Sequence, residues 1–285
     1  MGEILVKIVN KIPFSVLMSV YKKECPEYLD QSISSIEAQT LTPNEIILVK
    51  DGPIGSELSK IIEKHSKKFD GQFKIISLPV NQGLGEALRQ GTKYVTTDWI
   101  MRMDTDDICV DNRFELQLNV IKHDPDIAVV GGQIDEFKNS PDNIIGFRKV
   151  PETTRQIKKY LKWRCPFNHP TVLINKNKLI AAGGYQKFGT FEDYYLWCRM
   201  IAKGYLVKNL SNVLVHMRVD DSLYQRRGDL GNIKYVFKLQ AYMYRHHLAS
   251  PISCLLGLNI KIFNILVSGR TRKLIYRKVI HKREY

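Results

Sequence analysis

Short apolar runs alternate with segments of helical periodicity in the first hundred residues of the chain. The runs lack the polar alternation of a half-exposed strand, which is typical of strands buried on both faces of a parallel sheet. The four strands predicted in this way cover residues 14–20, 45–49, 73–78 and 99–103. Between the first two, Leu29, Ile33 and Ile36 recur at the spacing of one helical face. This β-α-β-α order predicts an α/β fold with a doubly wound, mostly parallel sheet and right-handed crossovers.

The second half of the chain is less regular. We predict strands at 127–132 and 213–218, a polar helix at 153–162, and a loop at 165–170 that enters a further strand. Tyr194, Trp197 and Ile201 share one face of a helix that begins near Phe191. These elements are expected to extend the same sheet and to cover it.

Polar residues follow three of the four predicted strands. Ser19 and Tyr21 close the first strand, Asp51 follows the second, and an acidic tetrad from Asp104 to Asp107 follows the fourth. Doubly wound sheets bind ligands beyond the carboxyl ends of their strands, near the point where the strand order reverses. The sequence therefore predicts a nucleotide site at this edge of the sheet.

The tetrad Asp104-Thr105-Asp106-Asp107 concentrates three carboxylates at one strand end. Carboxylates gathered there repel each other and lose hydration, and a divalent cation held together with a phosphate relieves both costs. Hard oxygen ligands suit Mg²⁺ or Mn²⁺. The alternative is a solvated acidic loop ahead of the helix that starts near Asn112.

Two further motifs lie at predicted helix starts. The glycines of 81–89 resemble a dinucleotide-binding fingerprint, but they follow the third strand and lack a third glycine at the required spacing. We expect a tight turn into a helix that presents Arg89 to an anion. Glu192 and Asp193 fall in the first turn of another helix. Carboxylates there either favour the helix N-terminus or serve as a base aimed into the cleft.

With these motifs in this order, the chain resembles the family 2 glycosyltransferases, which have the GT-A fold. It is particularly similar to the bacterial members that build capsule, exopolysaccharide and O-antigen units. The resemblance runs from about Phe14 to Gly228, with one departure, because Lys22 stands where the family usually has Asn after Tyr21. It implies a catalytic domain at 13–228 and leaves a helical, basic segment at 229–285.

The resemblance implies a role for each motif on the nucleotide side. Ser19 and Tyr21 belong to the opening strand, Asp51 matches the acid that holds the uracil base, and Arg89 matches an arginine that lies against the nucleotide. Asp104-Thr105-Asp106 matches the DxD motif of the family, whose last acid binds the metal, so Asp106 is the expected metal ligand. The first acid, Asp104, approaches the ribose and the metal shell.

The resemblance also implies roles on the acceptor side. Asp193, paired with Glu192, matches the catalytic base, while Arg226 and Arg227 resemble a basic segment that closes over the diphosphate. His216 could complete the metal shell, or it could be a packed histidine at a strand end. The arginine pair could also be solvated charge alone.

These roles imply an inverting, metal-assisted hexosyltransferase that uses Mn²⁺ or Mg²⁺ and a UDP-sugar donor. UDP-galactose and UDP-glucose are the first donors to test. The residues flanking the site offer weaker candidates for sugar contacts, namely Trp163, His169 and Trp197.

The net charge of +14 implies an anionic partner, and most of its excess lies at one end of the chain. Seven basic residues fall within 270–283, after an apolar segment at 255–267 that is interrupted by polar residues. This pattern predicts a helix in the interface of an anionic membrane. We therefore expect a peripheral protein on the inner face of the cell membrane, acting on an undecaprenyl-diphosphate-linked saccharide. The alternative is a helix packed on the catalytic domain, followed by a frayed tail.

Other classes of protein fit the sequence less well. We find no apolar stretch of the roughly 18 residues that a membrane span needs, and no secretion-signal pattern at the start, so a cytoplasmic protein is expected. A sugar-phosphate nucleotidyltransferase normally carries a glycine-rich loop after its first strand, which 21–25 does not provide. A nucleic-acid binder would be expected to interleave aromatic and basic residues. We find no such motif in this sequence, so no nucleic-acid partner is predicted.

Overall fold

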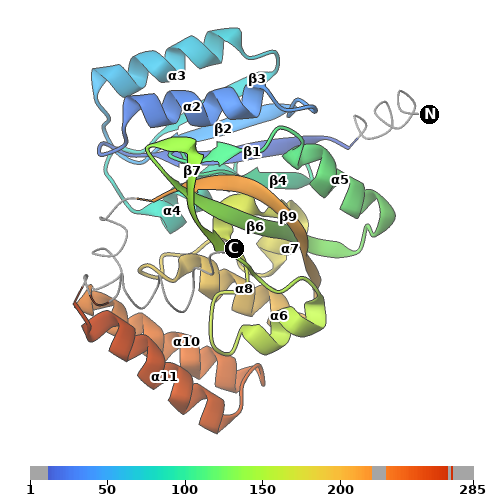
Figure 1. The fold of residues 1–285 in the computed structure, drawn as a ribbon, viewed down its shortest axis with the longest axis vertical. Helices are drawn as coiled ribbons and strands as arrows, with labels where there is room; N and C mark the ends of the chain where they lie inside the picture. The colour runs from blue at the N-terminus through green and yellow to red at the C-terminus, as the bar shows by residue number, and fades with distance from the viewer. Residues whose placement is uncertain (1–11, 220–228, 269–270, 272–285) are drawn as a thin grey trace.

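The first four predicted strands form the parallel half of a nine-stranded sheet (Figure 1). The structure is a computed structural model, and it describes residues 12–219, 229–268 and 271. The strands of this half are β1 (Phe14–Val20), β2 (Glu45–Lys50), β3 (Gln72–Ser77) and β4 (Trp99–Arg102). They lie in the order β3-β2-β1-β4 and are all parallel. The strand order reverses at β1, so β1 and β4 border the switch point where such sheets bind ligands.

The other half of the sheet is mixed. From β4 it continues through β8 (Leu173–Asn175), β6 (Ile127–Lys138), β9 (Leu206–Arg218) and β5 (Ile108–Cys109), while β7 (Ser140–Arg148) pairs with β6. The strands β6 and β9 are parallel, whereas β8, β5 and β7 are antiparallel to their neighbours. The mostly parallel, doubly wound prediction is confirmed.

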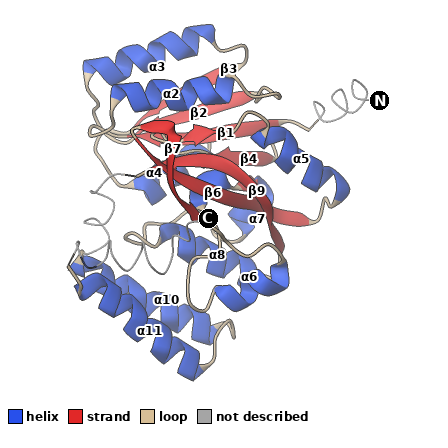
Figure 2. Cartoon of the chain, in the orientation of Figure 1, coloured by secondary structure: helices blue, strands red, loops and turns tan. Residues whose placement is uncertain are grey.

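Helices cover both faces of the sheet (Figure 2). One face carries α2 (Pro26–Glu37), α3 (Ser56–Lys68) and α5 (Arg113–His123). The other carries α4 (Leu84–Thr92), α6 (Thr154–Tyr160), α7 (Lys176–Ala181) and α8 (Glu192–Ala202). Along β1, Val16 and Met18 join the first core and Leu17 the second. Because side chains alternate across a strand, two covered faces require the uninterrupted apolar runs seen in the sequence.

Two C-terminal helices form a hairpin at the far end of the molecule from α2 and α3 (Figure 1). They are α10 (Ile233–Arg245), preceded by the turn η2 (Leu230–Asn232), and α11 (Pro251–Leu266). The Lys261 Nζ donates to the Trp163 carbonyl at 3.2 Å. A Cβ at Gly257 would come within 3.1 Å of Gln240 and 3.3 Å of the Lys162 carbonyl oxygen. The helix α11 therefore packs closely on α10 and on the segment after α6.

Among the described residues, no helix is long and apolar enough to cross a membrane. The cysteines at 25, 109, 165, 198 and 254 are all free thiols. The structure also extends several predicted elements, since β6 continues to Lys138 and β9 begins at Leu206. A short turn, η1 (His169–Thr171), occupies the predicted loop before β8.

Candidate active site

The carboxyl ends of β1, β2 and β4 converge at the switch point of the sheet. The Asp51 amide donates to the Val20 carbonyl at 2.8 Å, and the Thr105 hydroxyl lies 3.4 Å from the Ser19 carbonyl. Ser19, Asp51 and the acidic tetrad are thus brought together at one edge, as the sequence predicts. Tyr21 follows directly after β1 and is half-buried.

Asp51 is buried and organises the loop before α4. Its carboxylate accepts the backbone amides of Gln82 at 2.7 Å and Gly83 at 2.9 Å. Gly83 has a φ of +91°, which glycine adopts without strain. The neighbouring Gly52 leaves no room for a side chain, because a Cβ there would lie 2.6 Å from the Asn81 nitrogen. Asp51 therefore fixes the loop, and its contact with a uracil base stays a prediction.

Arg89 lies on α4 and is held by its own helix. Its Nε and Nη2 atoms donate to the Glu86 carboxylate at 2.7 and 2.6 Å, and nearly half of its side chain is exposed. The contact holds the guanidinium one turn beyond the Asp51 loop. Its role against a nucleotide stays a prediction.

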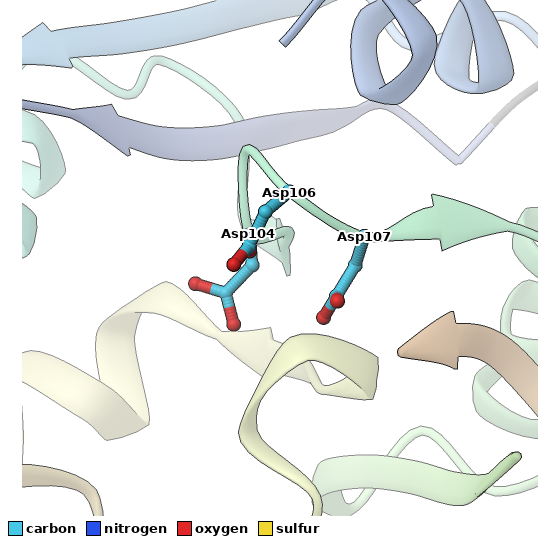
Figure 3. A group of neighbouring side chains, drawn as sticks. All are labelled: Asp104, Asp106 and Asp107. Atoms are coloured by element: carbon cyan, nitrogen blue, oxygen red, sulfur yellow. The ribbon is translucent and has the colours of Figure 1, made fainter. Parts of the chain in front are cut away.

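Three carboxylates form a cluster in the loop between β4 and β5. Figure 3 shows Asp104, Asp106 and Asp107 leaving this loop, with their carboxylates pointing away from β1. One oxygen from each lies within 4.8 Å of the others. Asp107 was absent from the ligands predicted from the sequence, although the acidic tetrad already contained the signal for it.

The charges of this cluster oppose one another. Burial and the neighbouring Asp104 and Glu24 raise the pKa of Asp106 to about 7. Burial and the charges of Asp106 and Asp104 raise the pKa of Asp107 well above its usual value. Three closely spaced carboxyl oxygens that resist joint ionisation fit a divalent cation, because such a cation neutralises them and prefers oxygen ligands.

Divalent ion binding is expected to stabilise the folded protein. Saturating Mn²⁺ should raise the Tm of the metal-free protein by about 2–4 °C for each kcal/mol of ligand binding, as expected for a domain of this size. Asp106→Asn should remove this shift without lowering the Tm in EDTA, because it also removes like-charge repulsion. Differential scanning fluorimetry with Mn²⁺ and with EDTA measures both effects. Equal Tm values in the two conditions would contradict a cation site here.

Arg218, at the end of β9, holds the loop of the acidic tetrad in place. Its guanidinium carbon lies 3.8 Å from the Tyr28 ring centroid and 4.6 Å from that of Phe137. Its Nε donates to the Asp106 carbonyl at 3.1 Å, and its backbone amide donates to the Asp107 carboxylate at 2.9 Å. Arg218 could not be identified from the sequence, because nothing along the chain indicates a partner more than a hundred residues away.

The structure does not bring His216 into the carboxylate cluster. Its Nδ1 lies 2.8 Å from Asp135, and its backbone pairs with Ile108 across β9 and β5. The Asp135 hydrogen bond raises the pKa of His216. The alternative of a packed strand-end histidine fits this geometry.

Glu192 and Asp193 begin α8, next to the start of α4. A Cβ at Gly85 would lie 3.1 Å from the Glu192 Cβ. The Asp193 carboxylate accepts the Tyr194 amide at 2.6 Å, and the Cys165 Sγ lies 3.4 Å from it. Burial and the charge of Asp193 raise the pKa of Glu192 to about 8, so Glu192 holds a proton at neutral pH. Two adjacent carboxyl groups in different protonation states can serve different roles in catalysis.

The remaining predicted contacts divide into three groups. Arg226 and Arg227 lie outside the described residues. His169 and Trp197 are buried, and His169 Nε2 lies 3.2 Å from the Tyr185 hydroxyl, so both belong to the core beneath the site. Trp163 is partly exposed beside α11.

Comparison with solved structures agrees with the architecture. A mannosyltransferase from Pyrobaculum calidifontis, solved with GDP-mannose and Mn²⁺, superposes with a TM-score of 0.61 at 14% identity, covering 96% of this chain and 81% of that one. The TarS protein of S. aureus, solved with UDP-GlcNAc, gives a TM-score of 0.59 at 16% identity, over 90% and 80% of the two chains. The fold is GT-A, with an acidic cluster at its switch point.

The chain belongs to glycosyl transferase family 2, whose family model matches residues 15–184. An uncharacterized glycosyltransferase of Haemophilus influenzae is 38% identical over 94% of this chain and 99% of its own length. The UDP-Gal:alpha-D-GlcNAc-diphosphoundecaprenol beta-1,3-galactosyltransferase of Escherichia coli is 35% identical over 94% and 97%. The amylovoran biosynthesis glycosyltransferase AmsE of Erwinia amylovora is 38% identical over 75% and 80%. The resemblance to the bacterial polysaccharide members is confirmed, and the nucleotidyltransferase alternative is excluded.

Proposed function

We propose that this glycosyltransferase transfers a hexose from a UDP-sugar, with inversion, to a hydroxyl of a lipid-diphosphate-linked saccharide in bacterial surface polysaccharide synthesis. The observation that carries the proposal is the meeting of two acidic groups at one site. The carboxylate cluster ends β4, the Glu192–Asp193 pair begins α8, and the charge of Asp104 acts on the pKa of Glu192. One group suits a diphosphate with its cation, and the other suits an acceptor hydroxyl.

The donor side is proposed from the cluster and from the relatives. Asp104, Asp106 and Asp107 would hold a Mn²⁺ or Mg²⁺ ion. When bound, the ion stabilises the negative charge of a departing diphosphate. Complexes of TarS contain UDP or UDP-GlcNAc, and the Escherichia coli relative is named for UDP-galactose, so we propose a UDP-sugar here. Asp51 and Arg89 are proposed on the nucleotide side.

The acceptor side is proposed to work through one base. The Asp193 carboxylate takes the proton of the acceptor hydroxyl as the hydroxyl oxygen attacks the anomeric carbon and the bond to the diphosphate breaks. Burial raises the pKa of Glu192 to about 8, and Asp193 is therefore proposed as the base of the pair. A single displacement of this kind inverts the anomeric centre. The relative named for a diphosphoundecaprenol substrate supports a lipid-linked acceptor.

Metal-dependent release of UDP tests this function. We would screen UDP-galactose, UDP-glucose and their N-acetyl forms with Mn²⁺, with and without a lipid-diphosphate-GlcNAc or GalNAc acceptor. Acceptor-stimulated UDP release is expected with one donor, and the anomeric proton coupling in the product should report inversion. Retention of configuration, or transfer from a GDP-sugar alone, would overturn the proposal.

We further propose that α11 attaches the protein to the inner face of the cell membrane. One face of this helix packs inward through Gly257, Lys261 and Ile265. The opposite face exposes large apolar side chains by 49–72%, at Ile252, Leu255, Leu256, Ile260, Phe263 and Leu266. Such a face suits the headgroup boundary of a bilayer. The basic run at 270–283 follows in the sequence and lies, apart from Thr271, outside the described residues.

Membrane binding should depend on the exposed face of α11. The pair Leu255→Gln and Phe263→Gln is expected to lower binding to anionic phosphatidylglycerol vesicles by about tenfold or more, since several CH₂ and ring contacts of ~0.8 kcal/mol each are lost. Cosedimentation at low and high salt measures this binding, and salt should weaken it because surface charge is screened. Ile180→Gln, at an equally exposed apolar residue of α7, is the control. Equal binding by all three proteins would refute the attachment.

A further inference from the structure

The last residue of β4 is a buried arginine that the proposed mechanism does not use. Arg102 is 1% exposed. Along β4, Met101 belongs to the core under α2 and α5, and Ile100 to the core that contains α8. Because side chains alternate along a strand, Arg102 shares the face of Ile100. Its side chain therefore lies on the α8 side of the sheet, at the strand end that carries the carboxylate cluster.

The backbone of Arg102 is fixed, and its guanidinium is only partly paired. Its amide donates to the Val172 carbonyl at 2.9 Å, and its carbonyl accepts from Arg113 at 2.7 Å. The Nη2 atom forms an ion pair with Asp104. The Nε and Nη1 atoms are buried and bind no atom of the residues that the structure describes. Two nitrogen atoms of the Arg102 guanidinium are thus buried without a hydrogen-bond partner among the described residues.

A buried acceptor faces the same region. The Glu192 Oε2 is also buried without a partner in the described part of the chain. Arg102 and Asp104 both lie near enough to Glu192 to act on its carboxyl group electrostatically. The Tyr185 hydroxyl, held by His169, lies in the same electrostatic neighbourhood of Arg102. Buried groups of both kinds thus lie at the end of β4 and at the start of α8, within electrostatic reach of each other.

Such groups are costly unless a ligand pairs with them. A buried polar atom without a hydrogen bond costs about 1–3 kcal/mol, and more when it is charged. The complement of a guanidinium N–H beside a carboxyl oxygen is a hydroxyl, since it accepts from the first and donates to the second. A diphosphate would also suit Arg102, but the carboxylate cluster with its cation is already proposed to hold that group. The chemistry therefore favours a sugar hydroxyl.

The position decides which sugar this is. The cluster is proposed to hold the diphosphate and Asp193 to hold the acceptor hydroxyl, so the transferred hexose must lie between them. We propose that Arg102, through Nε and Nη1, and Glu192, through Oε2, bind one hydroxyl of the transferred hexose and select the donor by it. This inference rests on the proposed function. It makes Arg102 a specificity-determining residue as well as a support for Asp104.

Deoxy donors test the subsite. With the preferred UDP-hexose, removal of one particular hydroxyl should lower the kcat/KM of the wild type on the order of 10²-fold, because the buried groups lose their partner. Glu192→Gln and Arg102→Lys should each lower kcat/KM with the intact donor. With that same deoxy donor, the kcat/KM of neither variant should fall much further. The other deoxy donors should lower the kcat/KM of the wild type and of both variants by similar factors. Such non-additivity marks a direct contact.

Binding measurements separate recognition of the hexose from a structural role. Glu192→Gln should bind UDP as tightly as the wild type in calorimetry with Mn²⁺, since UDP lacks the hexose, while its affinity for the UDP-hexose falls about tenfold. Asp98→Asn, at the opposite end of β4, is the control and should change neither affinity. If Arg102→Lys fails to fold, Glu192→Gln alone decides the question.

Two outcomes would overturn the subsite. In the first, the wild type transfers hexose, but the deoxy donors and the variants act additively at every position. In the second, the coupling appears with deoxy acceptors rather than deoxy donors, which would place the hydroxyl on the acceptor. Failure of the proposed function is distinguishable from both, because the wild type would then release no UDP from any UDP-sugar.

Discussion

Asp106→Asn should lower transfer by about 10³-fold or more, which corresponds to ~4 kcal/mol of barrier at 1.36 kcal/mol per factor of ten. The substitution keeps the size of the side chain but removes one anionic ligand from the cluster of Asp104, Asp106 and Asp107. The backbone carbonyl of Asp106, which accepts from Arg218, is unchanged, so the loop should keep its position. UDP release and product formation with saturating Mn²⁺ measure the loss.

The control for this variant lies just before β4, at the end of the strand opposite to the acidic loop. Asp98 precedes β4 at its amino end and is exposed, so Asp98→Asn removes an equal charge far from the switch point. It should retain wild-type activity. EDTA should reproduce the loss of Asp106→Asn in the wild type, and excess Mn²⁺ should restore it. Full activity in EDTA or in the Asp106 variant would refute the metal-assisted mechanism.

The parallel half of the sheet could be predicted because its strands are buried on both faces. The first strand was predicted with its observed bounds, Phe14–Val20, and the bounds of the other three differ from the observed ones by no more than one residue at either end. Burial on both faces leaves an uninterrupted apolar run, and the glycines and acids that follow mark where it stops. In this half, local sequence and tertiary environment agree.

The mixed half was harder because its pairing is not local. The two residues of β5 pair with β9, more than a hundred positions away, and β7 is largely exposed, so neither shows an apolar pattern. The helix α10 lies within the segment 229–285, which was predicted to be helical, and its Val236, Leu239 and Met243 have helical spacing. The short α7 lacked the length that makes a helical period visible.

The candidate site shows the same division between local and distant signals. Asp104, Asp106 and the Glu192–Asp193 pair were found because each is a compact acidic motif at the end of an element. Arg102 and Arg218 were missed, since their importance depends on partners from other elements. A charged residue at the end of an otherwise apolar β4 was nevertheless a signal. Two interpretations of His216 stayed open, a metal ligand and a packed strand-end histidine, because its place in a strand gives no information about Asp135.

Asp193→Asn should lower kcat by 10²-fold or more, or ~2.7 kcal/mol, while leaving UDP-sugar affinity nearly unchanged. Asparagine keeps the oxygen that accepts the Tyr194 amide at 2.6 Å, so the first turn of α8 should survive the change. What it loses is the capacity to take a proton. Single-turnover transfer and calorimetric binding of the donor separate the two effects.

A matched substitution tests whether the loss comes from the base itself. Glu86→Gln removes a carboxylate from the first turn of α4, next to the Glu192–Asp193 pair but paired with Arg89, and should leave the chemical step largely intact. Without acceptor, hydrolysis of the donor should fall less in Asp193→Asn than transfer does. The reason is that Asp193 is proposed to take the proton of the bound acceptor hydroxyl and not that of a water molecule. A variant that loses donor affinity while keeping its turnover would move Asp193 to the nucleotide side and refute its role as the base.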